Sequence, residues 1–277
     1  MVTILTLMMW FGCGDTSPET LVDELRVMAS VAEPPEVRPY TPFSYETYFA
    51  NPDDEDVVAL TWVCTNLGEG CLEALGGAQS ISYTDLEGTA PTWERPLSVS
   101  PALFGILDEE TTITATQAWT LACVRDVCPI IEKAADIDPE EEWPEEIQDA
   151  LSNPLAWMSK LPMEGVSLAY QLLTTSLSEE PHQNPTLEPS SDNPESLKRN
   201  KTFSLSFTVD GQFSEQAQLY NYMTGGGFMN PNTFVTASDT FELKGTAPKS
   251  GDETRIWIVL VDGKGGVAVW TEELSLR

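Results

Sequence analysis

The carboxyl-terminal part of the chain contains two apolar runs separated by a glycine-rich turn. The runs are residues 255–261 (R-I-W-I-V-L-V) and 267–270 (V-A-V-W), and residues 262–266 (D-G-K-G-G) join them. β-branched and aromatic residues favour strands, and an Asp-Gly pair favours a tight turn between antiparallel strands. This segment is the strongest hairpin signal in the sequence, and it predicts a β fold.

Alternating apolar and polar residues recur along the rest of the chain. In residues 203–209, Phe, Leu, Phe and Val fall on one face, and residues 24–31, 43–49 and 57–64 are further strand-like runs. Period-two alternation is typical of strands with one buried face. With hydrophobic residues at 41% of the chain, a packed core is expected. The fold class predicted is therefore all-β.

The amino terminus carries an apolar run that ends at a cysteine. Val2 to Gly12 comprises 11 residues, too few to span a bilayer, which needs about 20 in a helix. Such a run, a small residue and then Cys13 resemble a bacterial lipoprotein signal. The resemblance implies a signal peptide over 1–12, a lipid on Cys13 and a tether over 13–22. Gly14 then implies outer-membrane sorting. The alternative is a buried strand ending in a core thiol.

The number of cysteines bears on the same question. The chain has five, at positions 13, 64, 71, 123 and 128. An odd number leaves one unpaired in an oxidising compartment, but four remain if Cys13 carries lipid. Cys64, Cys71, Cys123 and Cys128 are therefore predicted to form disulfides, in any of three connectivities. The alternatives are free thiols and a four-thiolate zinc site, although the spacings are longer than zinc sites usually have.

Composition divides the remainder into two predicted domains. Residues 23–177 form the first, with an insertion at about 72–112 and a short helix at about 139–151, where apolar residues have roughly helical spacing. Residues 178–201 contain four prolines and read as a linker, with a short edge strand at Thr186-Leu187. Residues 202–277 form the second domain.

Two stretches resemble immunoglobulin-like domains. In the first domain, R-V-M-A-S-V-A-E-P-P-E-V-R-P, an aromatic strand and N-P-D ahead of L-T-W-V-C are similar to the start of such domains in bacterial surface lipoproteins. In the second, the hairpin around D-G-K-G-G is similar to the last two strands of immunoglobulin-like and PKD-type domains. The resemblance implies two immunoglobulin-like β-sandwiches in tandem. It implies a fold and not a function.

Catalytic motifs are absent from the sequence. The one histidine, His182, lies in the predicted linker, where a solvated side chain is expected, so a Ser-His-Asp triad is not expected. No cofactor motif is present. Asp53, Asp54 and Asp56 are weak calcium candidates. Trp62, Trp119 and Trp257 are expected in the core, whereas Trp93, Trp143 and Trp157 are weak candidates for contact with a partner.

The charge balance restricts the partners. Asp and Glu total 44 against 14 Lys and Arg, a net charge of −30. Such a chain repels nucleic acid and anionic lipid, so membrane attachment must be hydrophobic or covalent. The predicted function is a non-catalytic cell-envelope lipoprotein that contacts a protein or glycan or acts as a spacer. The alternatives are a calcium-stiffened adhesion module and a hydrolase using a carboxylate pair within residues 72–160.

Overall fold

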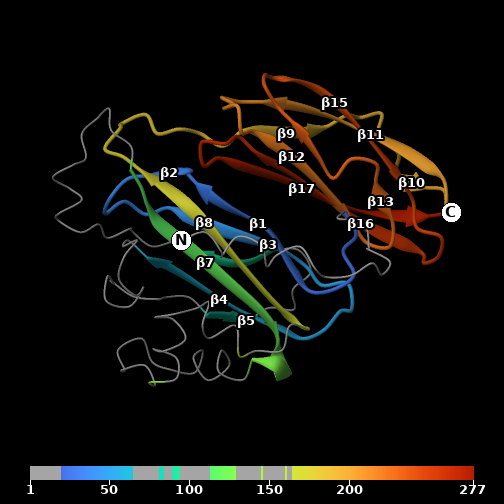
Figure 1. The fold of residues 1–277 in the computed structure, drawn as a ribbon, viewed down its shortest axis with the longest axis horizontal. Coiled ribbons are helices and arrows are strands. Elements are labelled where there is room, and N and C mark those ends of the chain that lie inside the picture. The colour runs from blue at the N-terminus through green and yellow to red at the C-terminus, as the bar shows by residue number, and fades with distance from the viewer. Residues whose placement is uncertain are drawn as a thin grey trace, which may run out of the picture.

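The computed structural model describes residues 20–64, 81–83, 89–93, 113–128, 145, 160 and 164–277. Apart from one short 3-10 turn, η1 (Arg125–Val127), its ordered elements are strands, so the expected all-β class is confirmed. The strands form four sheets, which enclose their cores in two pairs (Figure 1). Among the described residues, no helix is long and apolar enough to cross a membrane.

The first two sheets are called the N-terminal sheet pair. One sheet has the order β1 (Arg26–Glu33), β3 (Ser44–Ala50), β6 (Thr89–Trp93). The other has the order β2 (Glu36–Val37), β8 (Val166–Thr175), β7 (Ile113–Val124), β4 (Val57–Cys64), β5 (Ile81–Tyr83). Buried side chains of both sheets meet in one cluster, which includes Ala32, Tyr45, Val63, Ala118 and Leu173.

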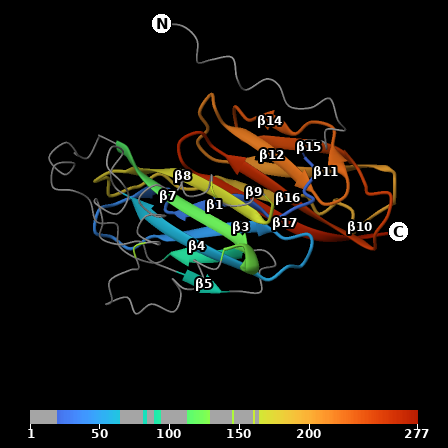
Figure 2. The ribbon, with the colours of Figure 1, turned by 60° about the horizontal axis from the view of Figure 1, so that its bottom comes forward.

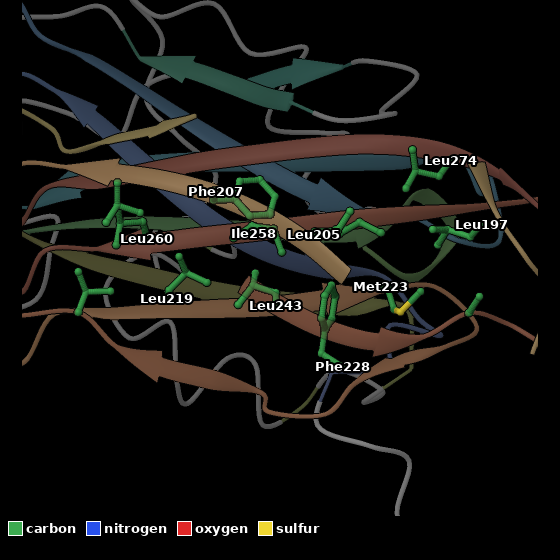
Figure 3. Close-up of a cluster of buried hydrophobic side chains, with 14 of the residues drawn as sticks. Leu197, Leu205, Phe207, Leu219, Met223, Phe228, Leu243, Ile258, Leu260 and Leu274 are labelled. Atoms are coloured by element: carbon green, nitrogen blue, oxygen red, sulfur yellow. The ribbon is translucent and has the colours of Figure 1, made fainter. Parts of the chain in front are cut away.

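The other two sheets are called the C-terminal sheet pair. One has the order β10 (Ser196–Leu197), β17 (Val267–Leu276), β16 (Glu253–Val261), β12 (Gln218–Met223), β14 (Asn232–Phe234). The other has the order β13 (Gly227–Phe228), β15 (Asp239–Thr246), β11 (Thr202–Asp210), β9 (Thr186–Pro189). Leu205, Phe207, Leu219, Ile258 and Leu260 fill the space between them (Figure 3).

Both sheet pairs have the same topology. In each, the first strand pairs with the third and the third with a later strand, whereas a short second strand runs parallel to the last strand of the larger sheet. In the C-terminal pair, β13 is the one addition to this pattern. Two facing sheets with this division of strands are an immunoglobulin-like sandwich. The expected immunoglobulin-like fold is therefore confirmed.

The hairpin expected around residues 262–266 is β16 and β17. They pair antiparallel from Glu253 with Ser275 to Val261 with Val267. Almost every residue of β16 is at least half-buried, because one face lines the sandwich core and the other meets the N-terminal sheet pair. Burial on both faces explains why this run is continuously apolar and does not alternate.

The prediction that residues at about 72–112 form an insertion is wrong in part. Two of its described stretches are strands, and they complete the sheets: β5 is an edge of the five-stranded sheet, and β6 is an edge of the three-stranded sheet. Edge strands of three and five residues are too short for a clear period-two signal. The helix expected over about 139–151 lies outside the described residues, except for Glu145.

The predicted linker and tether are also more ordered than expected. Within 178–201, β9 pairs with β11 and β10 pairs with β17, so this range contributes two strands to the C-terminal sheet pair. The edge strand expected at Thr186-Leu187 is confirmed. Residues 20–22, expected as the end of the tether, lie against the same sheet pair. Leu21 forms a parallel bridge with Met223, and Thr20 and Val22 are buried.

The two sheet pairs pack directly against each other. Strand β1 lies beside β17 and also contacts β16, as both Figure 1 and Figure 2 show. Val22, Ala50 and Trp257 form a buried cluster between the pairs, and Met28 and Tyr222 pack on it. Independently moving domains would not bury a tryptophan between them, so these contacts define one packed unit.

Candidate functional site

A group of hydrogen-bonded polar side chains lies where residues 176–185 cross from β8 to β9. This group is called the junction. It surrounds an open hollow of about 1070 Å³ on the molecular surface. The hollow is lined by side chains from both sheet pairs and from the crossing segment: Glu36, Thr174, Glu179, Glu180, Pro181, His182, Gln183, Asn184, Gly211, Gln212 and Lys264.

His182 and Asp262 form the centre of the junction. Nε2 of His182 lies 2.5 Å from Oδ2 of Asp262, and the two side chains are 12% and 0% exposed. The expectation of a solvated His182 is therefore wrong. The residue lies in a proline-rich segment, as the sequence indicated, but the partner that buries it is 80 residues away in the chain.

The glycine-rich turn after β16 holds the Asp262 carboxylate in place. Oδ1 of Asp262 accepts hydrogen bonds from the backbone N–H of Lys264 at 2.6 Å and of Gly266 at 2.9 Å. Gly263 and Gly265 have φ values of +75° and +107°, which glycine adopts at little cost. The D-G-K-G-G sequence therefore makes the hairpin and also closes its backbone around a buried acceptor.

Asn184 links the two sheet pairs through its amide group. Nδ2 donates to the carbonyl of Ala32 at 2.7 Å and to Oε2 of Glu33 at 2.6 Å, both at the end of β1. Oδ1 accepts from the backbone N–H of Val267 at 2.9 Å, at the start of β17. Nearly all the hydrogen-bonding capacity of this amide is therefore used across the junction.

Glu36 holds the other side of the crossing segment. Its carboxylate accepts from the hydroxyl of Ser176 and, at 3.2 Å, from the backbone N–H of His182. On the neighbouring strand β8, Nε2 of Gln171 donates to the carbonyl of Gly265 at 3.1 Å. These hydrogen bonds pair polar groups across the junction, although Oε1 of Gln171 and Oγ1 of Thr175 are buried without a partner.

The chemistry of the junction is that of a fixed contact. The Glu36 carboxylate accepts hydrogen bonds from the Ser176 hydroxyl and the backbone N–H of His182. The Asp262 carboxylate accepts from two backbone N–H groups and contacts the His182 ring. No group of three or more His, Cys, Asp or Glu able to hold a metal ion occurs among the residues that the structure describes. The junction therefore joins the sheet pairs and supplies no ligand set for a cation.

The structure does not bring the predicted calcium candidates together as a site. Asp53 and Asp54 are exposed in the turn before β4. Asp56 is ion-paired with Arg125, with Nε to Oδ2 at 2.6 Å, and this contact lowers the pKa of the Asp56 carboxyl. A carboxylate already paired with a guanidinium is a poor calcium ligand.

The cysteines fall into three groups. Cys123 and Cys128 form a disulfide at the end of β7, so the crossed pairing of these residues with Cys64 and Cys71 is not the one in the structure. Cys64 is the last residue of β4, whereas Cys13 and Cys71 lie outside the described residues.

Trp119 and Trp257 are buried, as expected. Trp93, a contact candidate placed in an irregular stretch, is instead the last residue of strand β6. Trp143 and Trp157 lie outside the described residues, and so does most of the range in which a carboxylate pair was predicted.

Sequence reasoning missed Asp262, Asn184 and Glu36. The turn sequence D-G-K-G-G begins at Asp262 and could have drawn attention to it, although no neighbouring residue indicates that its partner is His182.

Comparison with known proteins does not assign a family. No protein-family model matches the chain, and no curated protein sequence matches it. Among solved structures, residues 27–141 of a conjugate transposon protein from Bacteroides vulgatus are 14% identical, with 36% of this chain and 90% of that one covered and a TM-score of 0.26.

Two longer structures are similar at the same low level. Escherichia coli alpha-2-macroglobulin activated by porcine elastase is 9% identical, with 95% of this chain and 22% of that one covered and a TM-score of 0.25. A chimeric titin Z1Z2 carrying a KLER peptide from decorin is 12% identical, with 91% and 98% covered and a TM-score of 0.23. These values assign no function.

Proposed function

We propose that this protein is a bacterial cell-envelope lipoprotein, held on the outer membrane by a lipid on Cys13, with a non-catalytic role. Its two tandem immunoglobulin-like domains, the N-terminal and the C-terminal sheet pair, act as one rigid unit that contacts a protein or glycan partner or sets a distance from the membrane. The observation that carries the proposal is the junction, in which His182, Asp262 and Asn184 fasten the segment between the domains to both of them.

Rigidity follows from how the junction is built. The His182–Asp262 contact is largely shielded from water, two of the three hydrogen bonds of Asn184 are part-buried, and the Trp257 cluster lies in the same interface. Separating the domains would expose apolar surface and leave polar groups without partners, and each such group costs roughly 1–3 kcal/mol. Domains joined in this way keep one relative orientation, which suits a protein that presents a surface.

The disulfide supports export. Cys123 and Cys128 are bonded and fully buried. Disulfides persist in oxidising compartments such as the periplasm and the cell surface and are rare in the cytosol. With this pair formed, Cys64 and Cys71 can pair with each other, and Cys13 is then the cysteine left for lipid, in agreement with the signal-like run before it.

The use of the single histidine supports a non-catalytic role. A general acid or base must reach a proton on a substrate. Nε2 of His182 is instead held by Asp262, in a side chain that is 12% exposed. This histidine therefore serves the contact between the domains.

Metabolic labelling with a tagged fatty acid tests the anchor. We expect label on the wild-type protein, none on Cys13→Ser, and full label on the matched control Cys71→Ser, which also removes one thiol. Intact mass before and after reduction and alkylation reports the lipid and the disulfides together. Absence of label on wild type, or label remaining on Cys13→Ser, would refute the anchor.

A further inference from the structure

One long tract of this acidic chain has no charged residue. Residues 216–238 contain no Asp, Glu, Lys or Arg over 23 positions, whereas the next longest uncharged tracts have 14. In a chain with 58 charged residues among 277, a gap of this length is unusual. This tract therefore adds no charge of its own to the surface of a chain with a net charge of −30.

The fold gathers this tract on one side of the C-terminal sheet pair. Strands β13 and β14 are the edges of the two facing sheets, and β12 is the neighbour of β14. This side is called the uncharged edge and comprises residues 218–238. Met229 and Phe234 on it are 59% and 63% exposed, and they are two of the four large hydrophobic residues most exposed in the described part of the chain.

The amino-terminal segment reaches the protein at the same edge. The backbone N–H of Met223 donates to the carbonyl of Thr20 at 2.9 Å, and that of Val22 donates to the carbonyl of Met223 at 3.0 Å. The backbone N–H of Phe228, the residue before Met229, donates to Oγ1 of Thr20 at 3.0 Å. Met223 and Phe228 lie next to each other at one end of the core in Figure 3.

This attachment limits how far the uncharged edge can lie from the lipid. Thr20 is the seventh residue after Cys13, and seven fully extended residues span at most about 24 Å. Thr20 and Val22 are 1% and 2% exposed, so the packed end of the segment cannot lengthen the tether without breaking these contacts. A lipid on Cys13 would therefore lie within about 24 Å of Thr20, which contacts the uncharged edge at Met223 and Phe228.

We propose that the uncharged edge lies against the lipid bilayer, with Met229 and Phe234 entering its interfacial region. The inference rests on the lipid anchor proposed above. Exposed apolar side chains gain from contact with the interface, and the absence of charge removes the repulsion that the rest of a −30 surface would meet at anionic lipid. On β15 beside this edge, Lys244 is paired with Glu242 at 3.3 Å, so this pair adds no net charge.

Hydroxyl-radical footprinting of the full-length lipidated protein on phosphatidylcholine vesicles tests the proposal. Each oxidation rate is compared with that of Cys13→Ser protein in the presence of the same vesicles. We expect Met229 and Phe234 to be oxidised several-fold more slowly on the anchored protein. Tyr170, which is 59% exposed on the N-terminal sheet pair, is the internal control and should be unchanged.

A paired set of variants separates contact of the uncharged edge with the bilayer from anchoring alone. Met229→Asp/Phe234→Asp adds charge to exposed positions of the uncharged edge, whereas Thr208→Asp adds charge to an exposed position of β11. On vesicles, hydrogen exchange of the backbone over residues 224–238 should be slowed in wild type and in Thr208→Asp. It should return to the rate of the Cys13→Ser protein in the double variant.

The outcomes separate the two proposals. If the protein floats with the vesicles but Met229 and Phe234 are oxidised at the unanchored rate, the anchor stands and this inference is overturned. If the protein carries no lipid and does not float, both are overturned. If protection appears in Cys13→Ser without vesicles and rises with protein concentration, the edge binds a second copy of the chain and the inference is again overturned.

Discussion

The Asp262 carboxylate offers the sharpest test of the junction. It is fully buried and accepts from two backbone N–H groups, at 2.6 and 2.9 Å, while its second oxygen lies 2.5 Å from His182. The substitution Asp262→Ala removes the acceptor and leaves these three groups without it. The turn of the last hairpin and the contact between the domains should both weaken.

The size of the effect follows from the hydrogen bonds lost. Hydrogen bonds to a charged group contribute about 1.5–3 kcal/mol each, and breaking a buried pair by removing one partner costs about 3–5 kcal/mol. We therefore expect Asp262→Ala to lower the free energy of unfolding by roughly 4 kcal/mol. For a chain of this size, that corresponds to a fall in the melting temperature of about 10 °C.

Urea unfolding followed by tryptophan fluorescence measures this change, because Trp257 is 1% exposed at the interface between the domains. The matched control is Asp252→Ala, which removes a carboxylate from an exposed pair with Arg199 and should leave the midpoint almost unchanged. His182→Ala removes one of the three groups and should fall between the two. The double variant of His182 and Asp262 should lose less than the sum of the single losses.

The reasoning is refuted if Asp262→Ala unfolds within about 1 kcal/mol of wild type, which is within the range of ordinary surface substitutions. It is refuted in part if the losses of His182→Ala and Asp262→Ala simply add, since independent sites are additive and coupled ones are not.

Two further predictions concern the N-terminal sheet pair. Burial raises the pKa of Tyr45 to about 12, above its usual 10, so the unfolded chain releases this proton first as pH rises. The contribution of Tyr45 to the free energy of unfolding is fully present below about pH 10. It should fall by up to roughly 3 kcal/mol as pH rises towards 12. Urea midpoints at several pH values measure this, and a Tyr45→Phe protein that loses stability as steeply would contradict it. Replacing both Cys123 and Cys128 by Ser should lower the free energy of unfolding by roughly 2 kcal/mol, a modest loss because the disulfide closes a short loop. The urea midpoint measures this loss. An unchanged midpoint would show that the disulfide does not stabilise the fold.

Some elements could be predicted because their signal is local. The β16–β17 hairpin follows from two apolar runs and one glycine-rich turn, and β11 follows from strict alternation of Phe, Leu, Phe and Val with polar residues. Burial of Trp257 follows from its place within an apolar run. In each case neighbouring residues supply both the strand propensity and the face that is buried.

Other elements depended on contacts that no local pattern contains. The short strands β5 and β6 are held by pairing with β4 and β3 and not by their own sequence. Thr20 and Val22 read as the end of a tether, yet hydrogen bonds to Met223 place them against a sheet more than 200 residues further along the chain. Tertiary pairing outweighs weak local propensity at such edges.

By itself, the sequence determined the all-β class, the last hairpin, the cysteines available for pairing and the acidic net charge. The tertiary structure alone decided that the two sandwiches pack into one unit, that His182 is buried against Asp262, and that the uncharged edge meets the amino-terminal segment. The physical reason is that strand periodicity is set by adjacent residues. The partner of a buried polar group is set by the packing of residues distant in the chain, and that packing exists only after folding.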